Sequence, residues 1–269
     1  MHELSLAAGV LPEFSAEAVV ESAGRAGFSM VGLTVNPQSW TAATTRRVQG
    51  LLQSWHLTLL DVEVVWIPEG GLLNDNHRQI VDVAGDLGAR NLLVVSSEPE
   101  LPRTAAALNQ LCTWAASGEM RVALEFLMLT PIRTLRGALA AVHACDHPAA
   151  ALLVDALHLQ RGGARPEDLR DVDPRLLPYA QFCDGHSACT DSHEAYLEDA
   201  VDLRSAPGEG ELPLAALLEA LPSACPLSLE VRSRRHRERF PEPAERAAAI
   251  REQTLRFLRS TAAGAAAGS

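Results

Sequence analysis

The stretch NLLVVSSEPELPRTAAALNQLCTWAASGEMRVALEFL (91–127) decides the fold of this chain. It opens with an aliphatic run, NLLVVSS (91–97), and closes with another, RVALEFL (121–127), and both have the length and composition of buried strands. Between the two runs, residues 103–118 carry apolar side chains at helical spacing. A strand, a helix and a second strand in this order predict a unit of a parallel sheet.

The same alternation extends from this stretch to both ends of the chain. Eight strand-like runs occur, at 3–7, 30–35, 57–67, 91–97, 121–127, 151–156, 179–184 and 227–233. Segments with helical periodicity lie between them, most clearly at 15–27, 44–56, 77–89, 103–118 and 134–145. Gly27, Gly88 and Gly118 lie at the ends of three of these segments, which is typical of left-handed C-caps before a strand.

Eight such units in about 250 residues predict the α/β class and a single closed (β/α)8 barrel, or TIM barrel. A doubly wound sheet would carry a glycine-rich phosphate-binding turn after its first strand, whereas this chain has AAGVLPEF (7–14) there. No linker-like change in composition interrupts residues 1–262, so we predict one domain over that range. The small-residue stretch 263–269 is predicted to be a disordered C-terminal tail.

Composition restricts the kinds of partner and of chemistry. The formal net charge of −11 argues against nucleic acid as a partner, because phosphate binding requires clustered Lys and Arg. Lysine is absent, which excludes Schiff-base chemistry on this chain. No stretch resembles a signal peptide or a membrane span, so we expect a cytoplasmic protein with no membrane partner. The cysteines form no CxxC pair and are expected to be reduced: Cys112, Cys145, Cys183, Cys189 and Cys225.

Four residues near the ends of the last four strands are candidate metal ligands. The active site of such a barrel lies at the C-terminal ends of its strands, where this chain places Glu125, Asp155, Gln181 and Glu230. Each alone could be satisfied by an arginine or a helix N-terminus, but three ionised carboxylates in apolar strands need compensating positive charge. All-oxygen ligation favours one Mn²⁺ or Mg²⁺ ion, with Co²⁺ as an alternative.

Several short motifs carry a resemblance to a known family. They are Glu125-Phe126, DALHLQRGG (155–163), PEDL (166–169), QFCDG (181–185), PGEGEL (207–212) and LEVRS (229–233). Together, in this order, they resemble the sugar phosphate isomerase/epimerase superfamily, the xylose-isomerase-like TIM barrels, over about residues 3–260.

The resemblance implies a set of roles for these residues. A cation would be held by Glu125, Asp155, Gln181 and Glu230, and Glu125 and Glu230 would also form the acid–base pair. Many members have His at the strand-seven position. Gln181 departs from that pattern and resembles the branch that contains 3-dehydroshikimate dehydratases.

Three further residues have candidate roles near the cation. His158, three residues after Asp155, could polarise a carbonyl or act as a base, or could be a surface loop histidine. Arg232 points to the same face as Glu230 on an extended strand, where it could bind an anionic substrate group or orient Glu230. Glu63 could bind substrate hydroxyls or form a buried ion pair.

Candidate substrate-binding residues also lie in two loops. His186 and Arg204 flank the long loop after the seventh strand, where barrels often bind anions, although either could be a solvated residue. Trp66 could line an apolar wall beside the substrate or pack in the core. The basic run 232–239 is interpreted as a solvated or oligomer-facing loop, and the oligomeric state, including a homo-oligomer, is left open.

We therefore predict a divalent-metal-dependent isomerase or epimerase that acts on a small polyhydroxylated carbonyl compound. Removal of a proton next to the carbonyl would give an enediolate, which is then reprotonated. The alternative is a lyase that dehydrates a cyclic hydroxy-ketone such as 3-dehydroshikimate, and a non-catalytic ligand-binding barrel is a weaker alternative. An abasic-DNA endonuclease would need more histidine ligands and a basic groove, which this sequence lacks.

Overall fold

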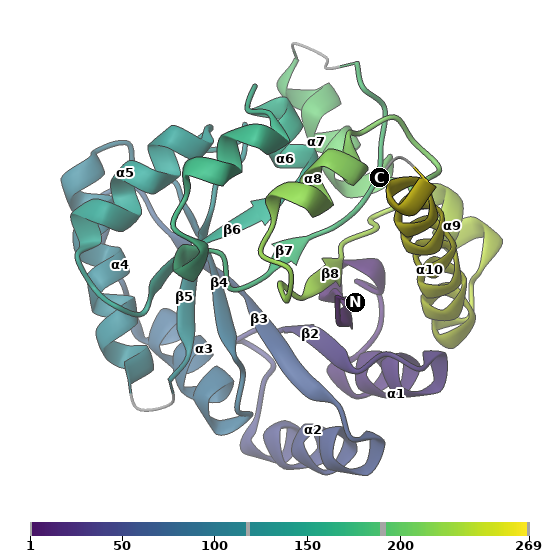
Figure 1. The fold of residues 1–269 in the computed structure, drawn as a ribbon. Coiled ribbons are helices and arrows are strands. Elements are labelled where there is room, and N and C mark those ends of the chain that lie inside the picture. The colour runs from purple at the N-terminus through teal and green to yellow at the C-terminus, as the bar shows by residue number, and fades with distance from the viewer. Residues whose placement is uncertain (1, 117–118, 189–191, 268–269) are drawn as a thin grey trace.

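The eight strands of the protein pair in chain order and close into a parallel barrel, since β1 also pairs with β8 (Figure 1). The computed structural model describes residues 2–116, 119–188 and 192–267, so the predicted C-cap Gly118 and the thiol Cys189 lie outside the described residues. The strands are β1 (Leu4–Leu6), β2 (Met30–Thr34), β3 (Thr58–Ile67), β4 (Asn91–Ser96), β5 (Arg121–Glu125), β6 (Ala150–Asp155), β7 (Ala180–Gln181) and β8 (Leu227–Leu229). The prediction of a single (β/α)8 barrel is confirmed.

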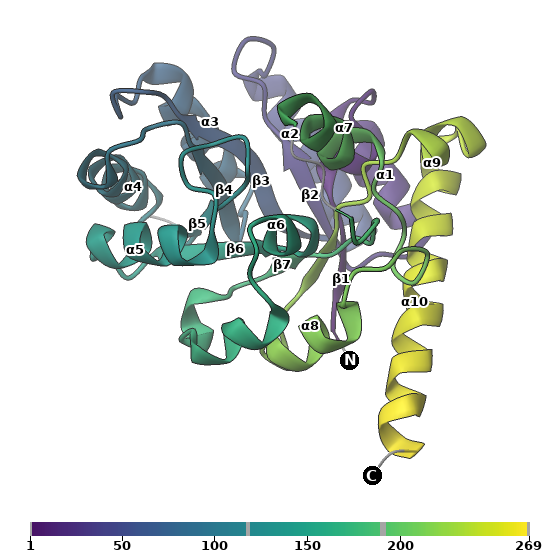
Figure 2. The same ribbon diagram turned by 90° about the horizontal axis from the view of Figure 1, so that it is seen from above.

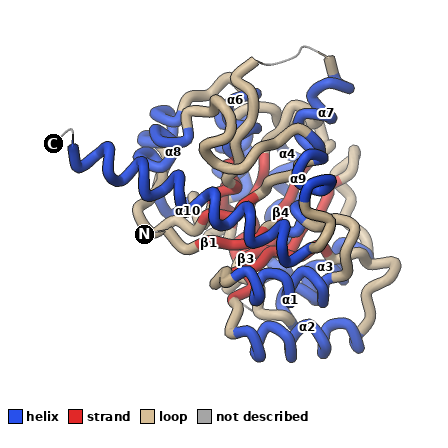
Figure 3. Tube along the Cα trace, turned by 90° about the vertical axis from the view of Figure 1, so that its right-hand side faces the viewer, coloured by secondary structure: helices blue, strands red, loops and turns tan. Residues whose placement is uncertain are grey.

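Helices surround the barrel and connect its strands (Figures 1 and 3). The α-helices are α1 (Ala16–Ala26), α2 (Ala42–Trp55), α3 (Asp75–Asp86), α4 (Leu101–Ala115), α5 (Leu135–Cys145), α6 (Ala156–Arg161), α7 (His193–Asp202), α8 (Leu214–Ala220), α9 (Arg234–Arg239) and α10 (Pro243–Ala267). Short 3-10 helices are η1 (Ala8–Val10), η3 (Pro166–Asp171) and η4 (Pro174–Leu176). Gly27 (φ 78°) and Gly88 (φ 71°) adopt the predicted left-handed conformation after α1 and α3.

Side chains inside the barrel form a floor beneath its C-terminal end. This inner cluster consists of Met30, Leu60, Leu93, Val95, Ala123, Leu127, Ala151, Leu153 and Tyr179. Ala123, Leu153 and Tyr179 lie two residues before three of the predicted ligands, and alternate residues of a strand share a face. The predicted ligands therefore form the next layer upward, at the mouth of the barrel.

The last helix, α10, lies along one side of the barrel, and its C-terminal part extends beyond the barrel (Figures 2 and 3). Its N-terminal part is anchored by buried Arg246, which forms an ion pair with Glu13 and donates a hydrogen bond to the carbonyl of Val10. Helix α10 ends at Ala267, and residues 268–269 lie outside the described residues, so the disordered tail at 263–269 stays a prediction. Among the described helices, none is long and apolar enough to cross a membrane.

Four of the five cysteines are described, and all four are buried free thiols: Cys112, Cys145, Cys183 and Cys225. This agrees with the expectation of reduced cysteines for those positions.

Candidate metal centre

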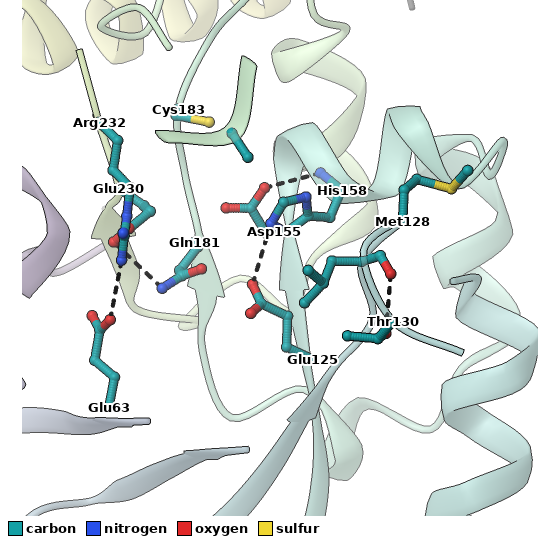
Figure 4. A network of polar contacts seen from close by, with 12 residues as sticks. Glu63, Glu125, Met128, Thr130, Asp155, His158, Gln181, Cys183, Glu230 and Arg232 are labelled. Atoms are coloured by element: carbon teal, nitrogen blue, oxygen red, sulfur yellow. Dashed lines mark hydrogen bonds and ion pairs between the residues drawn. The ribbon is translucent and has the colours of Figure 1, made fainter. Parts of the chain in front are cut away.

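The four predicted ligands lie at the C-terminal end of the barrel and are all buried (Figure 4). Glu125, Asp155 and Gln181 are the last residues of β5, β6 and β7, and Glu230 follows β8 directly. Glu125, Gln181 and Glu230 line a cavity of about 260 Å³, whereas Asp155 lies outside its lining and is completely buried. The volume is near the lower limit for pockets that take drug-sized molecules, so the cavity suits a small ligand.

Two groups of side chains make up this centre. Glu125, Asp155 and His158 each offer a ligand atom, and these atoms all lie within 4.8 Å of one another. Beside them, the amide of Gln181 donates to Glu230 Oε2 at 3.5 Å. Figure 4 shows Gln181 between Glu230 on one side and the Glu125–Asp155 pair on the other. His158 therefore lies close enough to Glu125 and Asp155 to share a cation with them, which its position in the sequence did not reveal.

The local sequence explains how Asp155 and His158 come together. Asp155 ends β6 and is also the N-cap of α6, where its Oδ1 accepts the backbone N–H of His158 at 3.0 Å. Because His158 lies three residues after the N-cap Asp155, in the first turn of α6, its imidazole lies near the ends of the strands. His158 Nε2 lies 3.8 Å from Glu125 Oε1. Because the imidazole is buried, its pKa is lowered to about 4, so His158 is neutral at physiological pH.

Buried negative charge exceeds buried positive charge at this end of the barrel. Two guanidiniums, those of Arg204 and Arg232, lie among five buried carboxylates. The five carboxylates influence one another electrostatically, and they belong to Asp61, Glu63, Glu125, Asp155 and Glu230. Burial and the charge of Asp155 raise the pKa of Glu125 to about 8, and burial and the charge of Glu230 raise that of Asp61 to about 7.

Each guanidinium neutralises one predicted ligand. Arg204 donates to Asp155 Oδ2 at 2.6 Å and also to the carbonyl of Ala200. Arg232 forms a close ion pair with Glu230 and a longer one, 3.5 Å, with Glu63. Burial alone would raise the pKa of Asp155, but the Arg204 charge and hydrogen bond hold it below its ordinary value. Asp155 and Glu230 are therefore satisfied by arginines, as the sequence analysis allowed for any single carboxylate. No arginine of the described ranges forms an ion pair with Glu125.

Among the described residues, two carboxylate oxygens are fully buried and have no hydrogen-bond donor. They are Glu63 Oε1 and Asp61 Oδ1, both buried. Buried acceptors in folded proteins almost always have a partner, so the orphaned oxygen of Glu63, which lines the cavity, is a further sign that positive charge or a donor completes the site. The donor set of three carboxylates, an amide and a neutral imidazole fits a divalent cation.

Most of the predicted substrate-binding residues line the same cavity. Glu63, Trp66, Arg204 and Arg232 do so. His186 does not, because it is exposed on the loop after β7. The carboxylate of Asp184 accepts three backbone N–H groups, from Gly185, Gly208 and Leu212, and ties this loop to the PGEGEL turn.

Several residues at the centre were missed by sequence reasoning. The cavity has an apolar wall contributed by β3, β4, the segment after β5, and α7, namely Val64, Leu93, Val95, Leu127, Leu129, Leu197, Ala200 and Val201. Tyr196 contacts His158, and Tyr179 donates to Asp61 at 3.5 Å. Gly9 packs against the Glu230–Arg232 pair so closely that a Cβ there would lie 2.3 Å from Glu230 Oε1. No motif marked these residues, because their roles depend on contacts between distant strands.

Residues 20–261 match the family model described as xylose isomerase-like TIM barrel. The chain therefore belongs to that family, as the motif resemblance indicated. No curated protein matches the sequence.

Solved structures with the same fold match nearly the whole chain. The IolI protein with a binding zinc atom is 17% identical (TM-score 0.79; 96% of this chain and 99% of that chain). The probable 3-DHS dehydratase AsbF of Bacillus anthracis is 17% identical (TM-score 0.71; 92% and 98%). A D-allulose 3-epimerase of Methylomonas sp. is 16% identical (TM-score 0.70; 96% and 96%).

One matched structure is much longer than this chain. It is a fusion of a xylose isomerase-like TIM barrel with a 4-hydroxyphenylpyruvate dioxygenase, and it is 22% identical (TM-score 0.76). The match covers 96% of this chain but only 44% of the fusion protein. At these identities, the likeness to all four structures shows the fold alone.

Proposed function

We propose that the protein is a divalent-metal-dependent isomerase or epimerase that acts on a small polyhydroxylated carbonyl compound. The observation that carries the proposal is the excess of buried carboxylates around one small cavity at the C-terminal mouth of the barrel. Neutralising them with a cation removes the large cost of burying unpaired charge. The zinc atom bound to the IolI protein and the epimerase among the structural neighbours support the proposal.

The residues that would hold the cation are Glu125, Asp155, Gln181 and Glu230, with His158 beside them. Carboxylate and amide oxygens favour Mn²⁺ or Mg²⁺, and the nearby imidazole adds Co²⁺ and Zn²⁺ to the ions worth testing. The bound ion would polarise the substrate carbonyl and acidify the adjacent C–H.

The chain's own residues would then move the proton. Glu125 on β5 and Glu230 after β8 belong to strands on different sides of Gln181 (Figure 4), which suits an acid–base pair acting on two faces of a substrate. His158 is neutral, so it can accept a proton or a hydrogen bond but does not bring a permanent charge. Arg232 lines the cavity with its side chain 32% exposed, and it is suited to bind an anionic or hydroxyl group of the substrate.

The test is hydrogen–deuterium exchange on substrates. The Mn²⁺, Mg²⁺, Co²⁺ and Zn²⁺ forms are incubated in D₂O with a panel of hydroxy-ketones, and deuterium incorporation is followed by NMR. We expect exchange at the carbon next to the carbonyl, abolished by chelation and reduced at least about 100-fold in Glu125→Gln. Asp173→Asn, which changes an exposed carboxylate far from the cavity, is the matched control. If no panel member exchanges with any ion, proton abstraction is the wrong chemistry.

A specific observation favours a second candidate, a lyase that dehydrates a cyclic hydroxy-ketone. The apolar wall of the cavity offers no hydrogen bonds to the hydroxyls of an open-chain sugar, and it would pack well against the face of a carbon ring. The dehydratase among the structural neighbours supports this alternative. In the same assay, loss of water from a cyclic member of the panel identifies the lyase, whereas exchange or isomerisation without water loss identifies the isomerase.

A non-catalytic barrel is the remaining alternative. It predicts that the protein binds no divalent ion and that Glu125→Gln and Glu230→Gln change neither its stability nor its ligand binding. The cytoplasmic location and the small-molecule nature of the partner stay predictions from the sequence.

A further inference from the structure

Tyr196 on α7 forms the closest polar contact that His158 makes. The Tyr196 hydroxyl lies 2.5 Å from His158 Nδ1, and both side chains are buried. The same hydroxyl accepts the backbone N–H of Met128 at 3.2 Å. Tyr196 is therefore held from two sides, by the segment after β5 and by α6.

The second ring nitrogen of His158 faces the ligand cluster. Arg204 Nη2 lies 3.3 Å from His158 Nε2, and Glu125 Oε1 lies 3.8 Å from the same nitrogen. A guanidinium can only donate hydrogen bonds, so Nε2 must be the acceptor in this contact. In a neutral imidazole the proton is then on Nδ1, where it is donated to the Tyr196 hydroxyl.

The rest of α7 is fixed to the same elements. Asp199 forms a buried ion pair with Arg161 of α6 at 2.7 Å, and Leu197, Ala200 and Val201 line the cavity. The helix that forms part of the cavity wall thus also holds the imidazole. Hydrogen-bond partners of this kind fix the tautomer and the ring orientation of histidines at metal sites.

We propose that Tyr196 is a positioning residue that, as the acceptor of the Nδ1–H, holds His158 in the tautomer whose Nε2 lone pair faces Arg204, with Glu125 Oε1 3.8 Å from that nitrogen. The catalytic use of this lone pair rests on the proposed function, whereas the tautomer does not. A directed lone pair serves either as a metal ligand or as a base for substrate, and both uses require an unprotonated Nε2.

The test is the ¹⁵N chemical shifts and proton couplings of the His158 ring in the full-length protein, measured with and without Mg²⁺. His158→Gln assigns the signals. We expect a protonated Nδ1 and an unprotonated Nε2 in the wild type. In Tyr196→Phe, which keeps the ring and removes only the hydroxyl, we expect a substantial population of the Nε2–H form. Tyr179→Phe is the matched control, because it removes the other buried phenol hydroxyl, which contacts Asp61 and not His158.

The outcomes separate this inference from the proposed function. A wild-type ring protonated at Nε2, or a Tyr196→Phe ring identical to the wild type, overturns the inference whether or not the protein is an enzyme. If deuterium exchange is found, Tyr196→Phe should lower kcat about 10-fold or more while KM changes much less, in line with partners of metal-site histidines. A correct tautomer together with no exchange on any substrate leaves the inference standing and rejects the proposed function.

Discussion

At the level of single residues, Glu125 forms no ion pair with a guanidinium, among the described residues, that would stabilise its ionised form. Its nearest partner in the centre is the neutral His158, and Asp155 and Glu230 add negative charge around it. A carboxyl group in this setting holds its proton until about pH 8. The ionised form that a metal ligand needs is therefore disfavoured until a cation binds.

This gives the first prediction, for protein treated with a chelator. The pKa of Glu125 is raised from 4.5 to about 8, so its contribution to stability is full below about pH 4.5 and is lost as the pH rises through about 8. Asp61, raised to about 7, acts in the same direction. Urea unfolding should show stability falling from about pH 5 to about pH 8.5, with a flatter profile in Glu125→Gln. An identical profile in the variant would show that Glu125 is not the titrating group.

Gly9 gives the second prediction at this scale. A Cβ at Gly9 would lie 2.3 Å from both Arg232 Nε and Glu230 Oε1, so Gly9→Ala should displace this ion pair. We expect a loss of about 1–3 kcal/mol in the free energy of unfolding, together with weaker Mn²⁺ binding by calorimetry.

Gly50→Ala is the control for this substitution. Gly50 lies inside α2 with nothing within 4 Å of an added Cβ, so alanine should raise stability by about 0.5–1 kcal/mol. If both variants behave alike, the close packing of Gly9 against the pair has no energetic importance.

At the level of elements, the strands were predicted well and their ends less well. The runs at 179–184 and 227–233 suggested strands of six and seven residues, but β7 contains two residues and β8 three. A buried apolar run beyond the last ladder hydrogen bond has the same composition as a strand, so composition alone does not mark where pairing ends. Gln181 and Glu230 nevertheless lie where the sequence predicted candidate ligands, since Gln181 ends β7 and Glu230 follows β8 directly.

Helix α7 gives the third prediction. Ala200 faces the cavity, which is only about 260 Å³, so Ala200→Leu should exclude part of the substrate. We expect KM to rise about 10-fold or more while the affinity for the cation stays unchanged. Glu194→Leu, on the exposed first turn of α7, should change neither quantity. An unchanged KM in Ala200→Leu would mean that substrate does not contact α7.

At the level of the whole molecule, closure of the barrel creates the centre. Residues 9 and 230 come together only because β1 pairs with β8, and Tyr196 reaches His158 across the long segment after β7. Alternation along the chain predicted the barrel and therefore the position of the candidate ligands at the strand ends. It did not predict the roles of Gly9, Asp61, Tyr179 and Tyr196, since those depend on which side chains face one another after closure.

The central claim is that one divalent cation binds at the carboxylate cluster, and direct metal titration tests it. Calorimetry with Mn²⁺ on chelator-treated protein should show one site per chain, weakened at least about 10-fold in Glu125→Gln and in Glu230→Gln. At about 100 times the dissociation constant, the ion should add about 2.7 kcal/mol to the free energy of unfolding. Absence of binding by Mn²⁺, Mg²⁺, Co²⁺ and Zn²⁺, with stability unaffected by chelation, would contradict the account.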